Sequence, residues 1–355
     1  MIEIDFLPAK YGDCLWIEYG DDSMKHRILI DGGTARTRYE IRRKLRALPE
    51  DQRHFELLIV THIDNDHIAG ILGLLKEDEL GFTVDEIWFN GWPHLPGNDI
   101  ESFSADQGEL LSSAILKHGI PWNATFGKKT ILAGDSLPQI VLPGGMKLTV
   151  LSPATEHLEE LKEHWEDEIR KANLVPGFGL EVDEAEEIDE DEESFDIGSF
   201  PDVPRLARLP FEEDTSAGNG SSIALLAEYS DKVMLLCGDA FPSQLVLALN
   251  KISSGKIKLD LCKISHHASS HNTSPELLQK LDCKQWAVST NGSIFKHPKE
   301  VTIARVLDAV GDGCHLIFNY RSKYNKIWDH HYLKAKYQYM TSYPPEGQEG
   351  IKIKV

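Results

Sequence analysis

The fold of this chain is decided by the stretch Leu57-Leu58-Ile59-Val60-Thr61-His62-Ile63-Asp64-Asn65-Asp66-His67. Its first four residues form an apolar run of the kind that makes a buried β-strand. The remaining residues include two imidazoles and two carboxylates, which would lie where the strand ends and the chain turns. Imidazole nitrogen and carboxylate oxygen together suit zinc, manganese or iron. The pattern therefore predicts a metal site at the mouth of a sheet.

A simpler interpretation assigns the same polar residues to the start of a helix. An apolar helical segment begins at Ile68, and Asp64 or Asp66 could accept backbone N–H groups at its amino end. This interpretation accounts for a single carboxylate. It does not account for His62 and His67, which bracket the two carboxylates, so the metal site is favoured.

Three later apolar runs are also followed by histidine or aspartate residues. Functional groups collect at the ends of strands in open α/β sheets. We therefore expect the side chains that follow these runs to meet the 62–67 cluster. They are Asp239, His266, His267 and His297.

The 62–67 cluster resembles the signature His-x-His-x-Asp-His of the metallo-β-lactamase fold superfamily, with Asp64 in place of the second histidine. The resemblance implies an α/β fold, the metallo-β-lactamase αββα sandwich, with two mixed β-sheets packed face to face and helices outside. It also implies one or two divalent metal ions per chain, for which we expect zinc or manganese. An Asp at position 64 makes the first metal position harder and weaker for zinc. The implied metal ligands are His62, Asp64, Asp66, His67, Asp239 and His266.

The order of motifs in the second half is similar to the ComEC-like branch, the metallo-β-lactamase-like domain of DNA-uptake competence proteins that also occurs as free-standing soluble proteins. The matching features are a strand after Asn219, a Gly-Asp pair, a His-His-x-Ser motif and a His-Pro pair. Ala268 stands where glycine is usual in that branch. This resemblance implies a metal-dependent phosphodiesterase, with nuclease activity as the leading expectation.

The same resemblance implies catalytic roles for Asp66, His267 and His297. One of the histidines that is not a ligand would protonate the leaving oxygen as a general acid. Which of His266, His267 and His297 is ligand and which is acid stays open at the level of sequence.

Three further residues are expected to support the site. Asp31 precedes two glycines and could be an ordinary turn residue, but the order of motifs favours a buried carboxylate that supports the metal loop. Asn219 and Ser221 occupy the region where many relatives place another metal-binding histidine, and no histidine is present nearby.

Composition restricts the partners. The 355 residues carry a formal net charge of −20, and eleven of the acidic residues lie between Glu181 and Asp196 without a lysine or arginine among them. We expect that segment to be solvated and disordered, or to dock on a basic protein partner or the chain's own groove.

The five scattered cysteines predict neither disulfides nor a cysteine metal site. Without a membrane-length apolar run or a signal-like start, a soluble cytoplasmic protein is expected.

We predict one hydrolase domain at residues 1–310, with an acidic insertion at about 152–210 that has too few apolar residues to form a core. Residues 311–355 are predicted to be a C-terminal extension. Its segment 320–337 interleaves basic and aromatic residues, as a surface that binds DNA or RNA does. A solvated amphipathic face would give the same pattern.

Three functions remain open. The first is a metal-dependent nuclease that uses an activated water. The second is a hydrolase of a small phosphodiester, nucleotide or ester, because a fold does not determine a substrate. The third is a partner-gated or non-catalytic component of a multi-protein system, controlled by the acidic segment.

Overall fold

The architecture is described from a computed structural model, which covers residues 1–21, 24–97, 110–171 and 200–355. Two large mixed sheets form its centre. The six-stranded sheet has the order β18 (Ile351–Lys354), β1 (Ile2–Phe6), β2 (Leu15–Gly20), β3 (Lys25–Ile30), β5 (Leu57–Ile59) and β7 (Ile87–Trp88). The eight-stranded sheet has the order β17 (Met340–Ser342), β16 (His315–Phe318), β15 (Gln285–Val288), β13 (Leu261–Lys263), β11 (Lys232–Leu236), β10 (Ala224–Tyr229), β9 (Lys147–Ser152) and β8 (Gln139–Val141).

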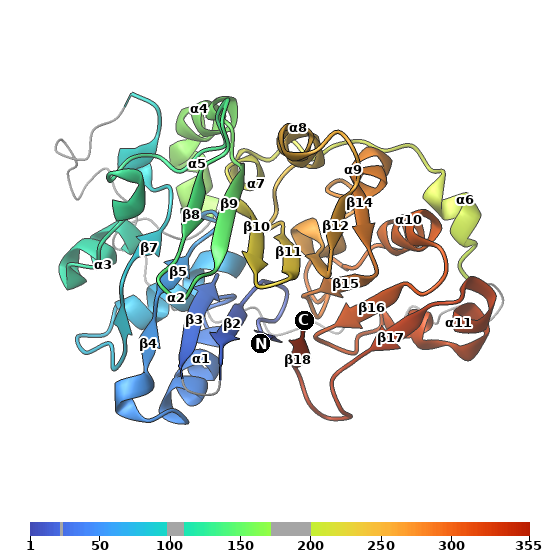
Figure 1. Cartoon of the computed structure of the whole chain (residues 1–355), viewed down its shortest axis with the longest axis horizontal. Helices are drawn as coiled ribbons and strands as arrows, with labels where there is room; N and C mark the ends of the chain where they lie inside the picture. The colour runs from blue at the N-terminus through green and yellow to red at the C-terminus, as the bar shows by residue number, and fades with distance from the viewer. Residues whose placement is uncertain (22–23, 98–109, 172–199) are drawn as a thin grey trace.

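Helices lie outside the two sheets (Figure 1). Two short strand pairs accompany them, β4 (His54–Phe55) with β6 (Thr83–Val84) and β12 (Ile257–Leu259) with β14 (Leu281–Cys283). The α-helices are α1 (Thr37–Arg46), α2 (Asn65–Leu75), α3 (Leu110–His118), α4 (Thr155–Glu163), α5 (Trp165–Lys171), α6 (Val203–Ala207), α7 (Ala217–Gly220), α8 (Pro242–Ile252), α9 (Pro275–Lys280), α10 (Glu300–Val310) and α11 (His331–Tyr337). The 3₁₀ turns are η1 (Glu50–Gln52), η2 (Trp92–His94), η4 (Ala124–Phe126), η5 (Ser265–Ala268) and η6 (Lys326–Asp329).

Three apolar cores lie between the sheets and the helices, and most strands are therefore buried on both faces. In β5, Leu57 and Ile59 point into the core between the two sheets, whereas Leu58 points into the core beneath α1 and α2. The third core lies between the eight-stranded sheet and α8, α9 and α10. Successive side chains of β5 thus point to opposite faces of the sheet and pack into two different cores. The fold is the expected metallo-β-lactamase αββα sandwich.

Strand direction places the polar loops on one edge. The pairs β3–β5 and β5–β7 are parallel, and so are the successive pairs from β11 through β13, β15 and β16 to β17. Their carboxyl ends therefore point the same way within each sheet. The loops that follow β3, β5, β11, β13 and β15 carry the residues singled out in the sequence.

The predicted insertion is partly integrated into the fold. Leu158 and Leu161 of α4 are fully buried in the core beneath the six-stranded sheet, so the first part of the segment 152–210 does contribute to a core. The acidic stretch from Glu181 to Asp196 lies outside the described residues, and its docking role stays a prediction.

The boundary predicted at residue 310 falls within the fold. Residues beyond it supply β16 and β17 to the eight-stranded sheet, and β18 pairs antiparallel with β1 at the edge of the other sheet. The sequence prediction missed this because a β-strand's partner at the far end of the chain leaves no local signal.

Removal of residues 351–355 should destabilise the whole protein. Ile351, Ile353 and Val355 pack against the core between the sheets. Their loss should lower the free energy of unfolding by roughly 2 to 4 kcal/mol, at about 1 kcal/mol for each partly buried side chain, in urea unfolding. The exposed Lys354→Ala is the matched control and should change little. An unchanged unfolding midpoint for the truncated chain would contradict an integral role for β18.

Candidate metal centre

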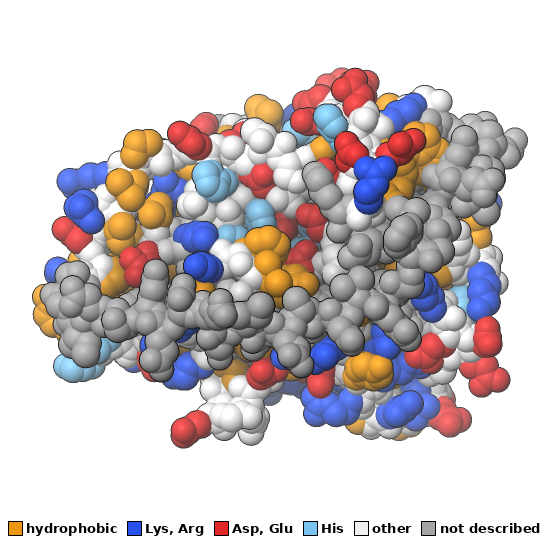
Figure 2. Space-filling model, turned by 180° about the vertical axis from the view of Figure 1, so that it is seen from behind, with side chains coloured by type: hydrophobic (Ala, Val, Ile, Leu, Met, Phe, Trp, Pro, Cys, Tyr) orange, Lys and Arg blue, Asp and Glu red, His pale blue; other side chains and the backbone are white. Residues whose placement is uncertain are grey.

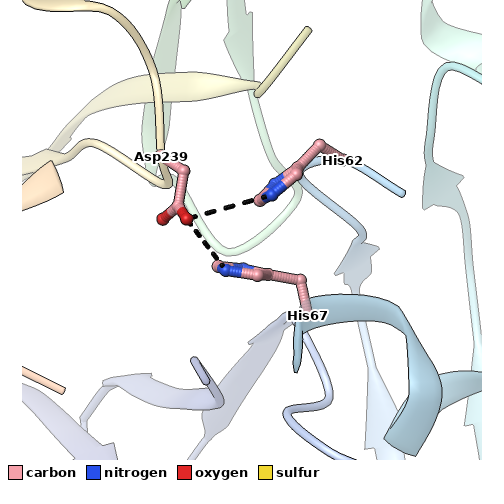
Figure 3. Close-up of side chains that lie close together, drawn as sticks. All are labelled: His62, His67 and Asp239. Atoms are coloured by element: carbon pink, nitrogen blue, oxygen red, sulfur yellow. Dashed lines mark ion pairs between the residues drawn. The ribbon is translucent and has the colours of Figure 1, made fainter. Parts of the chain in front are cut away.

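The first histidine cluster joins the two sheets. His62 follows β5 and His67 lies in the first turn of α2, whereas Asp239 follows β11 of the other sheet. Figure 3 shows the Asp239 carboxylate facing both rings. Its Oδ2 lies 3.3 Å from Nε2 of His67 and 3.9 Å from Nε2 of His62. These three residues offer ligand atoms within 4.8 Å of one another.

A second cluster shares His67. Nε2 of His267 lies 3.3 Å from Nε2 of His67 and 3.3 Å from Oδ2 of Asp66. The same nitrogen is 3.6 Å from Oδ2 of Asp239, so Asp239 adjoins both clusters. Three imidazoles and two carboxylates converge at one point between the sheets.

The outer nitrogens of two rings are already occupied. Nδ1 of His67 lies 2.8 Å from Oδ2 of Asp31, and Nδ1 of His267 lies 2.8 Å from the carbonyl oxygen of Ser289. An acceptor on Nδ1 favours the tautomer that carries its hydrogen there and leaves the Nε2 lone pair free. The two facing Nε2 atoms are then suited to a cation between them.

Asp31 holds the loop as well as the ring. It accepts the backbone N–H of Thr61 at 2.8 Å and the Thr61 hydroxyl at 2.8 Å. Its loop is pressed against α2, since a Cβ on Gly70 would lie 1.9 Å from the carbonyl oxygen of Gly32. Only glycine at position 70 lets α2 approach closely enough to place His67 over Asp31.

The charges of the site are strongly coupled. Burial by itself would lower the pKa of His267, but the carboxylates of Asp239, Asp13 and Asp66 outweigh it and raise the pKa to about 10. Burial would raise the pKa of Asp239, yet the neighbouring imidazoles of His67, His267 and His266 hold it well below its usual range. A field that holds protons on the rings also attracts a metal cation, which displaces those protons when it binds.

The donor set fits a metal. Among the described residues, Nε2 of His62 and Oδ1 of Asp239 find no hydrogen-bond partner although both atoms are buried, which is costly unless a ligand satisfies them. Oxygen and imidazole donors without thiolate match a hydrolytic zinc, manganese or iron site. His62, Asp66, His67, Asp239 and His267 would hold the ions.

Asp64 borders this set at its exposed side. Its Oδ2 lies 3.5 Å from Nε2 of His62, and about a third of the side chain is exposed. Glu168 of α5, which was not identified from the sequence, reaches the same place: a Cβ on Gly218 would lie 2.7 Å from Oδ1 of Asp64 and 3.3 Å from Oε2 of Glu168.

His266 has a different environment from His267. Its Nε2 lies 4.0 Å from Oδ2 of Asp239, while its Nδ1 lies 2.9 Å from Oδ1 of Asn272 and 3.3 Å from Oδ2 of Asp214. Asn219 reaches the same nitrogen, with Nδ2 at 3.2 Å. Both histidines and the following Ala268 have positive φ values of 46°, 51° and 66°. The backbone at 268 explains why glycine would be easier there.

His297 and Ser221 lie outside the two clusters. The His297 ring stands 5.5 Å from that of His266 at 90°, and burial, followed by the charges of His266 and His267, lowers its pKa to about 2. The Ser221 hydroxyl donates to the carbonyl oxygen of Gly218, whereas Ser222 accepts the backbone N–H of Asp239. The roles predicted for His297 and Ser221 stay predictions.

A buried ion pair behind the site was not identified from the sequence. Lys263 forms an ion pair with Asp13, donates to the carbonyl oxygen of Gly238 at 3.2 Å and lies 3.9 Å from Oδ1 of Asp239. Both charged side chains of the pair are almost fully buried. A lysine inside the apolar run 261–264 was the available signal, since an unpaired ammonium is not tolerated there.

Figure 2 shows acidic and histidine side chains gathered in a hollow on one face, bordered by basic and hydrophobic side chains.

Among the residues that the structure describes, no helix is long and apolar enough to cross a membrane.

Comparison with known proteins agrees with this geometry. Residues 7–145, which include the 62–67 cluster, match the family model of the metallo-beta-lactamase superfamily. Over these residues the chain is similar to the metallo-beta-lactamase superfamily, a class whose members are generally metal-dependent hydrolases and whose fold implies divalent-metal binding. No curated protein matches the chain.

Two solved structures illustrate how distant the structural neighbours are. The diiron β-hydroxylase CmlA from Streptomyces venezuelae is 12% identical with a TM-score of 0.39, and the alignment covers 100% of this chain and 54% of CmlA. The metallo-beta-lactamase fold protein YhfI from Bacillus subtilis is 11% identical with a TM-score of 0.44, covering 99% of this chain and 98% of YhfI. This chain thus spans about half the length of CmlA, and neither similarity transfers an activity.

Breaking the buried ion pair should be costly. Lys263→Met leaves the Asp13 carboxylate buried without its partner, and we expect a loss of roughly 3 to 5 kcal/mol in the free energy of unfolding. The double variant Lys263→Met with Asp13→Asn should recover part of that loss. Denaturant unfolding measures both.

The matched control is Lys232→Met, which removes a partly exposed ion pair with Asp260 and should cost about 0 to 1 kcal/mol. If Lys263→Met costs no more than this control, the buried pair does not stabilise the site.

Proposed function

We propose that the chain is a metal-dependent phosphodiesterase that cleaves nucleic acid. The single observation that supports this most directly is the convergence of His67 and His267 through their Nε2 atoms, 3.3 Å apart, beside the carboxylates of Asp66 and Asp239. Two candidate cation positions that share His67 and adjoin Asp239 match the paired metal sites common in nucleases and phosphatases. Bound divalent ions would lower the pKa of a water molecule and neutralise charge on the phosphate.

The chain's own residues would divide the remaining work. Asp239 would hold the centre from the eight-stranded sheet, and Asp31 and the Ser289 carbonyl would keep the rings of His67 and His267 in position. His266 is the candidate proton donor to the leaving oxygen, because Asn272 and Asp214 hold its Nδ1 while its Nε2 faces Asp239. The resemblance alone implied His266 as a ligand and His267 as a catalytic residue, with the choice left open, and this assignment takes the opposite choice.

A small phosphodiester is the second candidate. The side chains of His62, His67 and His267 have no exposed area, and that of Asp239 has only 3%. A centre this deep admits a small ester more readily than the middle of a duplex.

Metal content and cleavage test the proposal together. Asp239→Asn should lose bound metal, which elemental mass spectrometry measures. With added manganese or zinc, its rate of DNA or RNA cleavage should fall by about 100-fold or more. This loss exceeds the usual effect of removing a residue that only hydrogen-bonds to a metal ligand. The exposed Asp282→Asn is the matched control.

Cleavage of bis(p-nitrophenyl) phosphate without cleavage of any polynucleotide would favour the small substrate. Protein loaded with metal that hydrolyses neither would contradict the proposed activity.

A further test distinguishes the roles of the adjacent residues His266 and His267. His267→Gln should lose metal, whereas His266→Gln should retain it and lose turnover by about 100-fold or more, as expected for a general acid. Metal content and kcat are measured on both variants. Loss of metal in His266→Gln with full retention in His267→Gln would restore the assignment made from sequence.

A further inference from the structure

An exposed apolar pair lies beside the candidate metal centre. Ile294 is 55% exposed and Phe295 is 46% exposed, and both belong to the loop between β15 and α10 that also carries His297. The Phe295 ring stacks on the His297 ring, with 5.9 Å between centroids and 27° between planes. Because His297 in turn meets His266, the exposed ring is two ring contacts away from a side chain that faces Asp239.

The loop that carries Phe295 is firmly held. Lys296 donates its backbone N–H to the carbonyl oxygen of Gly292 at 3.0 Å, and Asn291 accepts from the backbone and hydroxyl of Ser293 at 2.9 Å each. A Cβ on Gly292 would lie 2.4 Å from the Tyr324 ring. The exposed ring is thus presented by a preorganised backbone, which lowers the entropy cost of binding a ligand on it.

Two further aromatic rings lie next to this loop. Tyr11 meets Phe295 edge to face at 5.9 Å, and Tyr324 packs on Gly292. We call Phe295, Tyr11 and Tyr324 the aromatic ledge. Tyr324 belongs to the basic and aromatic segment noted in the sequence, whereas Trp328 and Leu333 of that segment are buried in the core of the eight-stranded sheet.

Positive charge accompanies the ledge. Lys299 donates its Nζ–H to the carbonyl oxygen of Phe295 at 2.8 Å, and Lys296 follows Phe295 directly in the chain. Lys323 lies over the Tyr324 ring at 5.4 Å. In a chain of net charge −20, three lysines around these aromatic rings favour an anionic ligand.

We propose that the aromatic ledge binds unpaired bases of single-stranded nucleic acid, with Phe295 as the stacking platform and Lys296 and Lys323 against the flanking phosphates. Aromatic faces combined with basic side chains are the usual means of binding single strands, because every base offers a face for stacking. A duplex keeps its bases covered and would gain only the phosphate contacts. The inference rests on the proposed phosphodiesterase function and names its substrate.

Binding measured without cleavage tests the ledge. A fluorescein-labelled, phosphorothioate-linked oligothymidylate is titrated with metal-loaded protein, and Kd is followed by anisotropy at several salt concentrations. Phe295→Ala should weaken binding by roughly 5- to 100-fold, the range of one base stacked on an aromatic ring, while Phe295→Trp should stay within about twofold. Lys296→Gln should reduce the salt slope by about one.

Tyr332→Ala is the matched control, since Tyr332 is a similarly exposed aromatic residue on α11, and it should bind as the wild type does. Unfolding midpoints of all variants show whether each remains folded. Wild-type affinity in Phe295→Ala, or a duplex bound as tightly as the single strand, would overturn the inference, and so would no binding by the wild type.

The outcome separates the two proposals. Binding that depends on Phe295 without cleavage of unmodified oligonucleotides supports the ledge and contradicts nuclease activity. Cleavage of polynucleotides by Phe295→Ala at the wild-type rate and affinity supports the nuclease and overturns the ledge.

Discussion

The negative charge of Asp239, buried between the ends of two sheets, is the constraint on which the site depends. A carboxylate removed from water is costly unless charged or hydrogen-bonding groups surround it. Here His62 and His67 approach it from the six-stranded sheet, whereas Ser222 and Lys263 approach it from the eight-stranded sheet. The buried charge of Asp239 therefore draws side chains from both sheets to one place, which is the candidate metal centre.

Different groups orient the histidines from behind. Asp31 holds His67, the Ser289 carbonyl holds His267, and Asn272 with Asp214 holds His266. In each case the outer nitrogen is engaged and the inner nitrogen faces the centre. This arrangement places part of the metal affinity and any proton transfer under the control of residues that touch neither metal nor substrate.

The C-terminal strands connect the core to the exposed loop beside the site. Asn319, directly after β16, accepts the backbone N–H of Thr290 at 2.9 Å and donates to the Ser289 hydroxyl at 3.1 Å. Ser289 is also the residue whose carbonyl holds His267. The part of the chain predicted to be an extension thus supports both the metal centre and the loop that carries Phe295.

The sequence by itself predicted a metal site where apolar strands end, because histidine and aspartate cluster there, and the fold class followed from the resemblance of that cluster to a family signature. Nothing local, however, distinguishes His266 from His267, since adjacent residues differ only in where the backbone turns them. Asp13, Asp214 and Glu168 were missed for a related reason: an isolated carboxylate is common in sequence and becomes significant only when folding buries it beside a partner. The tertiary structure decided those pairings, because contacts between residues far apart in the chain depend on how the two sheets pack.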